Sequence, residues 1–253
     1  MKKYNVVVES QIGTFIINEN DVGVGWQLTV SGNYDLAELQ FVALLTKLLR
    51  DARENLIVLD VGANIGVHSV FFSREVGPKG KVFSFEAQRI VFNMLAGNIA
   101  LNSIENVYCA HNAVSDSIGT IDIPQFDYNA PFSLGSVEFG GQQKEFIGQE
   151  PQTDPENQEK VATVTLDSLN FDQVDFIKID VEGMELNVLR GAAGTIAAYK
   201  PIMLVEYLKS DESLLTKWLI EAGYRLYSGI GANYVCIPKE CELTLSGLPE
   251  VGA

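Results

Sequence analysis

The sequence predicts an α/β domain built on a mostly parallel sheet with helices on both faces. From residue 56 onward, apolar segments such as LIVLDVGA, KVFSFEA and PIMLVEYL alternate with segments of helical periodicity. Strands that are apolar throughout are typical of parallel sheets covered on both faces. Further along, YRLYSGIGANYVCIP places two strands around a Gly-Ala-Asn turn, which predicts an antiparallel last strand.

Composition favours a single domain over residues 1–253. With 47% hydrophobic and 20% charged residues, the chain can bury a substantial core. Its 18 basic and 33 acidic residues give a formal charge of -15. This balance argues against the basic surface of a nucleic-acid-binding protein and favours a small-molecule partner.

The expected compartment is the cytoplasm. The three cysteines are widely spread and show no paired spacing, so neither a disulfide framework nor a zinc site is indicated. The apolar run after the two N-terminal lysines is too short for a signal sequence, and no segment has the length of a membrane span. We therefore expect a soluble, unprocessed protein without a membrane partner, and the oligomeric state stays open.

Residues 1–50 are expected to form an N-terminal β flap followed by a helix. Between residues 4 and 30, β-branched runs, ending with WQLTV, alternate with glycines and with Asn20-Asp21, which is typical of hairpins. In DLAELQFVALLTKLLRDA, apolar residues recur every three or four positions. This spacing predicts an amphipathic helix that ends near Arg50.

The core that holds the ligand site is expected in residues 56–124 and 161–240, with helices near 66–75, 89–101, 184–198 and 211–222. Residues 125–160 break this pattern with glycines, prolines and many acidic residues. Long irregular segments are often lids or binding loops, and Phe126, Tyr128, Phe132 and Phe139 offer contact surface. We interpret the segment as an insertion acting as a lid, with a disordered linker as the alternative. Residues 241–253 are expected to form a loose tail.

The first strand-to-helix turn, DVGANIG, is expected to bind a nucleoside. Gly62 and Gly66 flank Asn64 in a spacing that resembles a dinucleotide-binding loop. Such a loop needs glycine where this chain has Asn64, whose side chain would obstruct a pyrophosphate. The pattern favours a nucleoside without a diphosphate, and a purely structural turn is the alternative.

The next strand, VFSFEA, ends in Glu86, which lies 86 - 66 = 20 residues beyond Gly66. An acidic residue at this distance is typical of a ribose-binding position. A surface glutamate without a ligand is the alternative. The strand context on both sides favours the ribose role.

The chain resembles a known family between residues 57 and 206. In order, LDVGANIGVHS, VFSFEA, NAVSDSIG, VTLDSL, VDFIKIDVEGMELNVLRGA and KPIMLVE closely resemble the FkbM-type S-adenosylmethionine-dependent methyltransferases. The resemblance implies a Rossmann-like, seven-stranded methyltransferase sheet, S-adenosylmethionine as cofactor, and O-methylation of a sugar or natural-product small molecule. The family usually has proline after the ribose acid, whereas this chain has Ala87 and Gln88.

The resemblance also implies cofactor-binding residues by position. The methionine end of the cofactor would be lined by residues of the first turn, namely Asp60, Gly62, Asn64 and Gly66. Glu86 would bind the ribose, and Asn112 with Ala113 would contact the adenine. Independently of the resemblance, Asp180 is expected to bind the cofactor, because it ends a strand that would face the aminoacyl and sulfonium end.

Chemistry is expected around DFIKIDVEGMEL, where Lys178, Asp180 and Glu182 are spaced to share one face of a strand. A structural alternative is an ion pair between Lys178 and Asp180, with Glu182 as a carboxylate at the start of the next helix. Methyl transfer needs an acceptor held in line and a base for its proton. Candidate catalytic residues are Asp180, Glu182, Glu206 and His68, while His111 is interpreted as a packing residue.

A magnesium ion held by Asp180 and Glu206 is a weaker option, because no further ligand adjoins Glu206 to complete an octahedral set. A nicotinamide-dependent oxidoreductase is disfavoured by Asn64 and by the lack of a Tyr-x-x-x-Lys pair. The sequence also leaves open an N-methyltransferase and a non-catalytic S-adenosylmethionine-binding or scaffolding protein. Retention of Asp180, Glu182 and Glu206 favours an enzyme.

Overall fold

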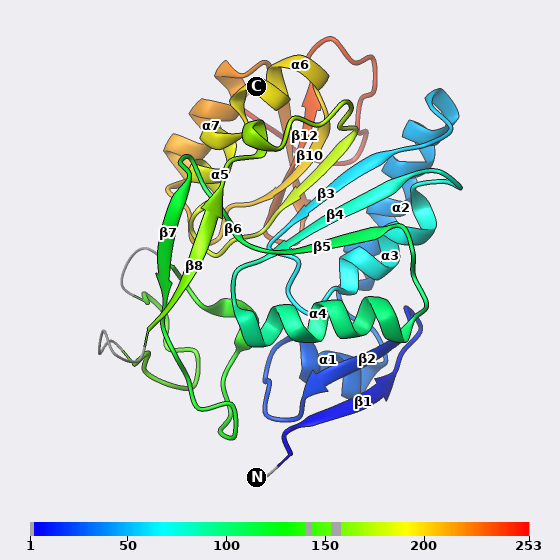
Figure 1. Cartoon of the computed structure of the whole chain (residues 1–253). Coiled ribbons are helices and arrows are strands. Elements are labelled where there is room, and N and C mark those ends of the chain that lie inside the picture. Colours follow the sequence, from blue (N-terminus) through cyan, green and yellow to red (C-terminus); the bar gives the residue numbers. More distant parts are fainter. Residues whose placement is uncertain (1–2, 140–142, 153–157, 253) are drawn as a thin grey trace.

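The fold is organised around one eight-stranded sheet (Figure 1). The computed structural model describes residues 3–139, 143–152 and 158–252. The strand order is β13-β11-β12-β10-β9-β3-β4-β5. The strands are β3 (Ile57–Val61), β4 (Lys81–Glu86), β5 (Val107–His111), β9 (Phe176–Ile179), β10 (Ile202–Glu206), β11 (Tyr224–Ile230), β12 (Asn233–Pro238) and β13 (Glu250–Val251).

Pairing in the sheet follows the expected pattern. Strands β5, β4, β3, β9 and β10 are parallel neighbours. Strand β12 pairs antiparallel with both β10 and β11, so the predicted antiparallel strand is confirmed. The family resemblance implies seven strands, and the eighth, β13, comes from residues predicted to be a loose tail. β13 pairs with β11, and Leu245 and Leu248 pack against the buried core, so the tail is part of the fold.

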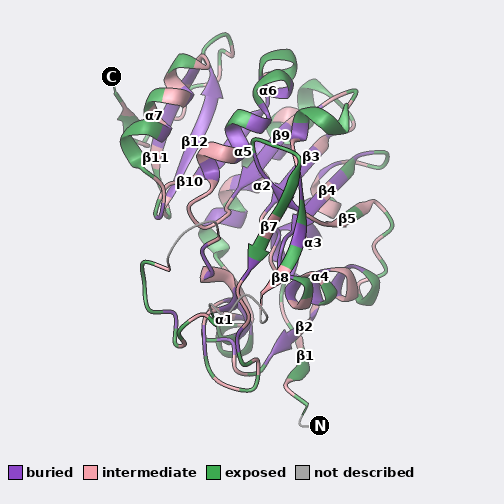
Figure 2. Cartoon of the chain, turned by 60° about the vertical axis from the view of Figure 1, so that its left-hand side comes forward, coloured by how far each residue is buried: buried purple, intermediate pink, exposed green. Residues whose placement is uncertain are grey.

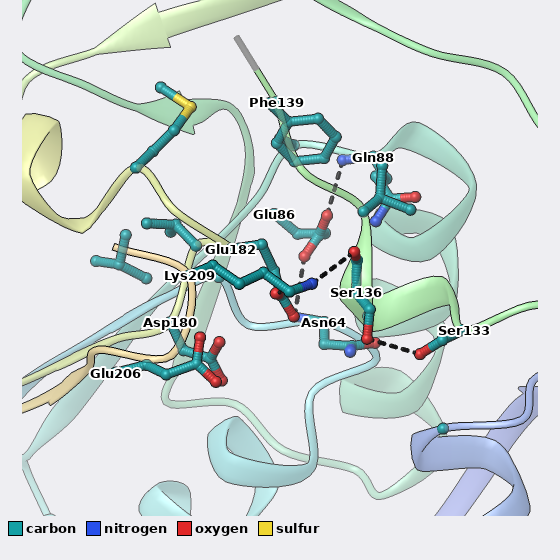
Figure 3. A pocket seen from close by; sticks show the side chains of 18 of the residues that line it. Asn64, Glu86, Gln88, Ser133, Ser136, Phe139, Asp180, Glu182, Glu206 and Lys209 are labelled. Atoms are coloured by element: carbon teal, nitrogen blue, oxygen red, sulfur yellow. Dashed lines mark hydrogen bonds and ion pairs between the residues drawn. The ribbon is translucent and has the colours of Figure 1, made fainter. Parts of the chain in front are cut away.

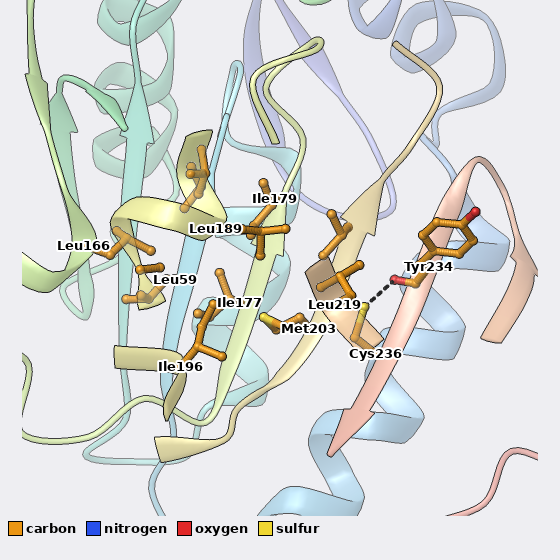
Figure 4. Packing of buried hydrophobic residues seen from close by; sticks show 14 of the residues in the cluster. Leu59, Leu166, Ile177, Ile179, Leu189, Ile196, Met203, Leu219, Tyr234 and Cys236 are labelled. Atoms are coloured by element: carbon orange, nitrogen blue, oxygen red, sulfur yellow. Dashed lines mark hydrogen bonds between the residues drawn. The ribbon is translucent and has the colours of Figure 1, made fainter. Parts of the chain in front are cut away.

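Helices cover both faces of the sheet because successive strand residues point to opposite sides. Val58 packs with α2 (Leu36–Ala52) and α3 (Val67–Glu75), whereas its neighbour Leu59 belongs to the cluster on the other face. That second face is covered by α5 (Glu185–Gly191), α6 (Ala193–Tyr199) and α7 (Glu212–Glu221) (Figure 4). None of the helices in the described residues is long and apolar enough to cross a membrane.

The N-terminal region contains one hairpin, not several. Strands β1 (Asn5–Glu9) and β2 (Thr14–Asn18) pair antiparallel, as expected of a β flap. The predicted strand around WQLTV is wrong, because these residues lie in α1 (Val24–Ser31). Its β-branched residues suggest a strand, but Val24 and Leu28 are buried at helical spacing, and this tertiary packing outweighs local propensity.

Two asparagines of α4 (Arg89–Leu101 and its last turn) fix the hairpin to the core. The side chain of Asn98 accepts from the backbone N–H of Ile16 at 2.6 Å and donates to the Ile16 carbonyl at 3.1 Å. Asn102 makes the same pair of bonds with Thr14, at 3.0 and 2.7 Å. The free edge of β2 is thus paired with side chains, which also protects it from pairing with another chain.

The insertion is anchored at both ends. Strands β6 (Ala113–Val114), β7 (Gly119–Ile123) and β8 (Glu159–Val164) form a separate sheet in the order β6-β8-β7, with β7 largely exposed (Figure 2). The described residues between β7 and β8 are irregular apart from the short helix η1 (Leu134–Ser136). Their apolar side chains pack with the hairpin, α1, α3 and α4, namely Phe126, Phe132, Leu134, Val137 and Ile147. Residues 140–142 and 153–157 of the predicted lid lie outside the described residues.

Candidate functional site

A cavity of about 300 Å³ opens at the carboxyl ends of the parallel strands. This is where open α/β sheets bind ligands. The cavity is lined by the ends of β3, β4, β9 and β10 and by the β5–β6 junction. Ser136 of η1 and Phe139 face these strand ends across the cavity (Figure 3). Residues of α1 and Tyr34 also line it. The N-terminal region and the insertion therefore both contribute to the site.

Gly62 lines the cavity where β3 ends. Its φ is +79°, and a Cβ atom there would lie 1.8 Å from the carbonyl oxygen of Asp180. The Gly62 N–H donates to the Phe85 carbonyl at 3.0 Å. Only glycine fits this combination of backbone angle and close approach, and it keeps the ends of β3, β4 and β9 together.

The other residues of the first turn have different positions. Asn64 lines the cavity, with a left-handed φ of 51° and a side-chain oxygen that accepts from the Ile65 N–H at 2.7 Å. Gly66 is absent from the cavity wall among the described residues, although the sequence placed it at the methionine end. A Cβ atom at Gly66 would lie 2.6 Å from the Leu95 side chain, so this glycine allows α3 to pack on α4.

Asp60 also differs from its predicted position. It is fully buried below the cavity, and its Oδ2 accepts from the Ser69 hydroxyl at 2.6 Å. Within the described residues it does not line the cavity. Asp60 therefore holds β3 to α3 from within the core. This position gives no support to a direct contact with the methionine end of the cofactor.

His68 is buried away from the cavity wall. Its Nε2 lies 2.8 Å from Glu38 Oε1, and Glu38 Oε2 accepts from Asn233 at 2.8 Å. The network ties α2, α3 and β12 together. The structure therefore does not support His68 as the base for an acceptor in the cavity.

Glu86 lines the cavity at the end of β4. Its carboxylate accepts from the backbone N–H groups of Asn64 at 2.9 Å and Gln88 at 2.7 Å. Burial raises the pKa of Glu86 to about 7, although these hydrogen bonds oppose the shift. The carboxylate is held by the main chain beside the first turn, and its binding of a ribose stays a prediction.

Asn112 and Ala113 line the cavity at the junction between β5 and β6. The Asn112 amide donates to the Ala162 carbonyl in β8 at 3.2 Å. The two residues thus lie one strand beyond Glu86, at the end of the cavity away from β9 and β10. Their contact with an adenine stays a prediction.

Three carboxylates converge at the other end of the cavity. Each of Asp180, Glu182 and Glu206 has an oxygen within 4.8 Å of the others (Figure 3). The predicted common strand face is wrong, because β9 ends at Ile179. Glu182 has a φ of 56° and Gly183 a φ of 98°, so a left-handed turn brings Glu182 to the cluster.

Two buried lysines neutralise part of this cluster. Lys178 Nζ lies 2.8 Å from Asp180 Oδ2, which confirms the ion pair considered from the sequence. Lys209 Nζ lies 2.7 Å from Glu182 Oε2 and donates to the Ser136 carbonyl of η1 at 2.9 Å. Lys209 thus joins the carboxylate cluster to the insertion.

The carboxylates differ in their proton affinity. Burial, followed by the negative charge of Asp180, raises the pKa of Glu182 to about 7, and the Lys209 ion pair opposes the shift. The same two causes raise the pKa of Glu206 to about 9. Among the described residues, no hydrogen-bond donor or cation pairs with the Glu206 carboxylate, and its Oε2 is buried. A group that titrates near neutral pH is suited to proton transfer.

The cluster does not support magnesium binding. Asp180 and Glu182 already pair with lysines, whose positive charges oppose a divalent ion at the same oxygens. Glu206 is the remaining member. Among the described residues, no fourth carboxylate joins these three to complete an octahedral ligand set for magnesium.

Several cavity residues have no motif in the sequence. Lys209 follows β10, while Ser136, Gln27 and Tyr34 come from segments distant in sequence. Glu185, rather than Glu182, occupies the start of α5 and accepts from the N–H groups of Val181 and Gly183 at 3.0 and 3.1 Å. Among these cavity residues, only Lys209 has a signal in the sequence, because it follows an apolar strand closely.

The sheet order, the antiparallel β12 and a cavity at the strand ends define a methyltransferase-type Rossmann fold. The family model of the FkbM methyltransferase domain matches residues 60–226 of the chain. The chain therefore belongs to the FkbM methyltransferase domain family.

Individual relatives are distant. The chain is 28% identical over 158 residues to methyltransferase sdnD of Sordaria araneosa, covering 54% of this chain and 60% of that protein. It is 27% identical over 179 residues to hexuronic acid methyltransferase AglP of Haloferax volcanii, covering 69% of this chain and 66% of that protein. A crystal structure of methyltransferase FkbM from Methylobacillus flagellatus KT aligns with a TM-score of 0.49 at 17% identity, covering 72% of this chain and 43% of that one.

Proposed function

We propose that the protein is an S-adenosylmethionine-dependent methyltransferase that methylates a hydroxyl of a sugar or natural-product small molecule. The observation that carries the proposal is the order of side chains along the cavity. Asn112, Glu86 and Gly62 follow one another at strand ends, and the carboxylate cluster comes next. Family membership and the names of the relatives support the same reaction class.

The cavity suits this cofactor. Glu86 is the acidic residue that would bind the ribose, and the cavity wall near Asp180 is rich in carboxylates that favour a cation. When bound, S-adenosylmethionine supplies an electrophilic methyl group on a sulfonium. Asn64 lines the cavity at the position where a dinucleotide-binding loop has glycine, which disfavours a nicotinamide cofactor.

We assign separate roles to the carboxylates. Asp180, fixed by Lys178, orients the cofactor and the acceptor at the methyl-transfer end. Glu182, with a pKa of about 7, is the candidate base for the acceptor hydroxyl. Glu206, with a pKa of about 9, holds its proton at neutral pH and can donate a hydrogen bond to the acceptor. Positioning by these groups supplies much of the rate expected for an in-line displacement.

The alternative without catalysis is an S-adenosylmethionine-binding or scaffolding protein, and N-methylation is the alternative within the same enzyme class. Calorimetry with S-adenosylmethionine and NAD, followed by turnover of methyl-labelled S-adenosylmethionine with a panel of acceptors, separates them. We expect saturable binding of S-adenosylmethionine alone and label transfer to a hydroxyl acceptor. Binding without transfer to any acceptor would support the scaffolding role, and saturable binding of NAD instead would reject the cofactor.

Glu86→Gln tests the cofactor position without changing the size of the side chain. The carboxamide keeps an acceptor for one backbone N–H but loses the charge-assisted bonds that the carboxylate offers to a ribose. We expect weaker S-adenosylmethionine binding by about 1 to 3 kcal/mol. Glu105→Gln, at a site outside the cavity wall, is the control. An unchanged dissociation constant in a folded Glu86→Gln protein would remove Glu86 from the site.

A further inference from the structure

Part of the cavity wall lies outside the matched methyltransferase domain. The family match begins at residue 60. The cavity is also lined by earlier residues, namely Gly23 just before α1, Val24 and Gln27 of α1, and Tyr34 of the following loop. The Tyr34 ring packs edge-on against the His68 ring, with 6.3 Å between centroids, and His68 bonds to Glu38. Glu38 also accepts from Asn233, the register partner of Glu206 in β10. These contacts place Tyr34 at the same end of the cavity as the carboxylate cluster.

We propose that the acceptor binds between Gln27, Tyr34 and Glu206, and that it is a neutral or amine-bearing polyhydroxyl molecule rather than an acid. This inference rests on the proposed function, because it assigns the part of the cavity that the cofactor leaves free. The predicted cofactor positions follow the ends of β5, β4 and β3. The wall that is not assigned to the cofactor includes Glu206 at the end of β10, Gln27 of α1 and Tyr34, together with η1 and Lys209.

Hydrogen-bonding groups in this part of the wall are available to a ligand. Within the described residues, the Gln27 carboxamide, the Tyr34 hydroxyl and the Glu206 carboxyl have no side-chain hydrogen-bond partner, although all three residues line the cavity. Together they offer both donors and acceptors. A molecule with several hydroxyl groups can pair with each of them, whereas an apolar acceptor would leave them unpaired at a cost in affinity.

The wall offers no free cation to an acid. Lys209 is the single lysine or arginine of the described wall, and it already pairs with Glu182. The other acidic side chains of the wall are Glu86, Glu145, Asp180 and Glu206; Asp180 pairs with Lys178, and Glu206 holds its proton at neutral pH. An anionic acceptor would find no unpaired cation in this partly buried site, which lowers its affinity, whereas a hydroxyl or an amine can hydrogen-bond to the carboxyl groups.

Tyr34 is a positioning residue in this arrangement. Burial, followed by the charges of Asp180 and Asp35, raises the pKa of the Tyr34 phenol far above its ordinary value. The phenol therefore stays neutral and orients an acceptor hydroxyl by hydrogen bonding. Proton removal is left to the carboxylate cluster.

Cysteine labelling tests the location without knowledge of the natural acceptor. Gln27→Cys and Asn112→Cys proteins are alkylated with iodoacetamide, with and without saturating S-adenosylhomocysteine, and each cysteine is followed by peptide mass spectrometry. We expect the cofactor product to slow labelling at position 112 about tenfold or more and at position 27 by about twofold or less. Equal protection at both positions would place the cofactor itself against α1 and overturn the proposal.

Three matched probes test the chemistry: methyl glucoside, methyl glucosaminide and methyl glucuronide. Their affinities for the S-adenosylhomocysteine complex are measured by saturation-transfer NMR. We expect the neutral and amino sugars to bind about tenfold more tightly than the glucuronide. Equal or tighter binding of the glucuronide, or no binding of any probe, would overturn the proposed acceptor class.

Substitutions of Tyr34 and Gln27 test whether these two side chains bind the sugar probes. Tyr34→Phe and Gln27→Ala should each weaken methyl glucoside binding about tenfold and leave S-adenosylhomocysteine affinity unchanged. Tyr4→Phe and Gln11→Ala, in the same N-terminal region but away from the cavity wall, are the matched controls. Unchanged probe affinity in both variants would reject these contacts. Failure of the parent protein to bind S-adenosylhomocysteine would instead reject the proposed function.

Discussion

Glu182 is a largely buried carboxylate that lies between a lysine and a second carboxylate. Its backbone is left-handed, which places its side chain over the end of β9, and Lys209 holds its Oε2 at 2.7 Å. Burial beside Asp180 opposes the effect of that lysine and raises the pKa of Glu182 to about 7. At neutral pH, a substantial fraction of the carboxyl is therefore able to accept a proton and to return it.

We expect kcat to rise with pH through about 7, because the base form of Glu182 is the one that removes the acceptor proton. Below that pH the carboxyl is protonated and turnover falls. Glu182→Gln should lower kcat by roughly 10² to 10⁴ and remove this limb of the profile. Steady-state rates between about pH 5.5 and 8.5 provide the measurement. A Glu182→Gln enzyme that keeps both kcat and the limb would reject Glu182 as the base.

Glu206 makes a related prediction for stability. Its pKa rises from 4.5 to about 9 on folding, because the carboxyl is buried beside Asp180. Between these pH values the native state holds a proton that the unfolded chain has lost. The free energy of unfolding should therefore fall as pH rises through this window.

Glu206→Gln should flatten that decline, since the amide has no proton to lose, and should stabilise the protein at high pH by on the order of 1 kcal/mol. Urea unfolding at about pH 5, 7 and 9 measures the effect. The exposed Glu242→Gln is the control and should follow the parent protein. An unaltered slope in Glu206→Gln would show that this carboxyl is ionised in the native state at neutral pH.

At the scale of elements, Asp21 connects α1 to the insertion. Its Oδ1 accepts from the N–H groups of Gly23 at 3.0 Å and Leu134 at 3.2 Å, and its Oδ2 accepts from Gly25 at 2.7 Å. The side chain is buried. One carboxylate thus supports two parts of the cavity wall that are more than a hundred residues apart in sequence.

Asp21→Ala should lower the free energy of unfolding by about 3 kcal/mol, because three backbone donors lose a charged acceptor in a buried environment. Chemical denaturation measures the change. Asp127→Ala is a matched control, since Asp127 accepts from the backbone of Asn129 in an exposed turn, and it should lower the free energy of unfolding much less than Asp21→Ala does. Equal effects of the two substitutions would mean that Asp21 has no special part in joining the wall.

Because the insertion packs against the core, deleting it is a poor test of its proposed role as a lid. Phe132 and Leu134 belong to the core shared with α1 and α4, so removing the whole segment would expose that core. Lys209→Met is a narrower change that breaks the bonds to Ser136 and Glu182. If the insertion acts as a lid, acceptor KM should rise about tenfold or more with cofactor affinity nearly intact. A parallel loss of cofactor affinity would indicate a structural role for the segment.

For the molecule as a whole, sequence reasoning succeeds where contacts are local. The alternation of β3, α3, β4 and α4 follows from apolar periodicity and from turn residues such as Gly62, which act within a few positions. It fails for α1, because WQLTV has strand propensity and its helical packing depends on the distant residues Phe132 and Leu134. Local pattern carries no information about such partners.

In the candidate site too, residues placed by local pattern could be predicted, and residues placed by distant contacts could not. Glu86, Asp180 and Glu206 could be predicted because each lies at the carboxyl end of an apolar strand, and these ends face the crevice. Tyr34 and Lys209 could not be assigned a role, since their positions depend on how separate segments close over the sheet. His68 has suitable chemistry, but its ion pair with Glu38 places it in the core.

The position of β12 has a consequence for how the protein is made. β12 lies between β10 and β11 although it follows both in the chain, and Asn233 in β12 is paired with Glu206. During synthesis β11 has no neighbour in the sheet until β12 emerges and forms a hairpin with it, so β10 stays at an open edge until that hairpin docks. Because β9 and β10 pair directly, Asp180 and Glu206 can come together earlier. Glu206 gains its partner Asn233 only in the docking step, so its carboxyl should be the last member of the cluster to be enclosed in a refolding protein.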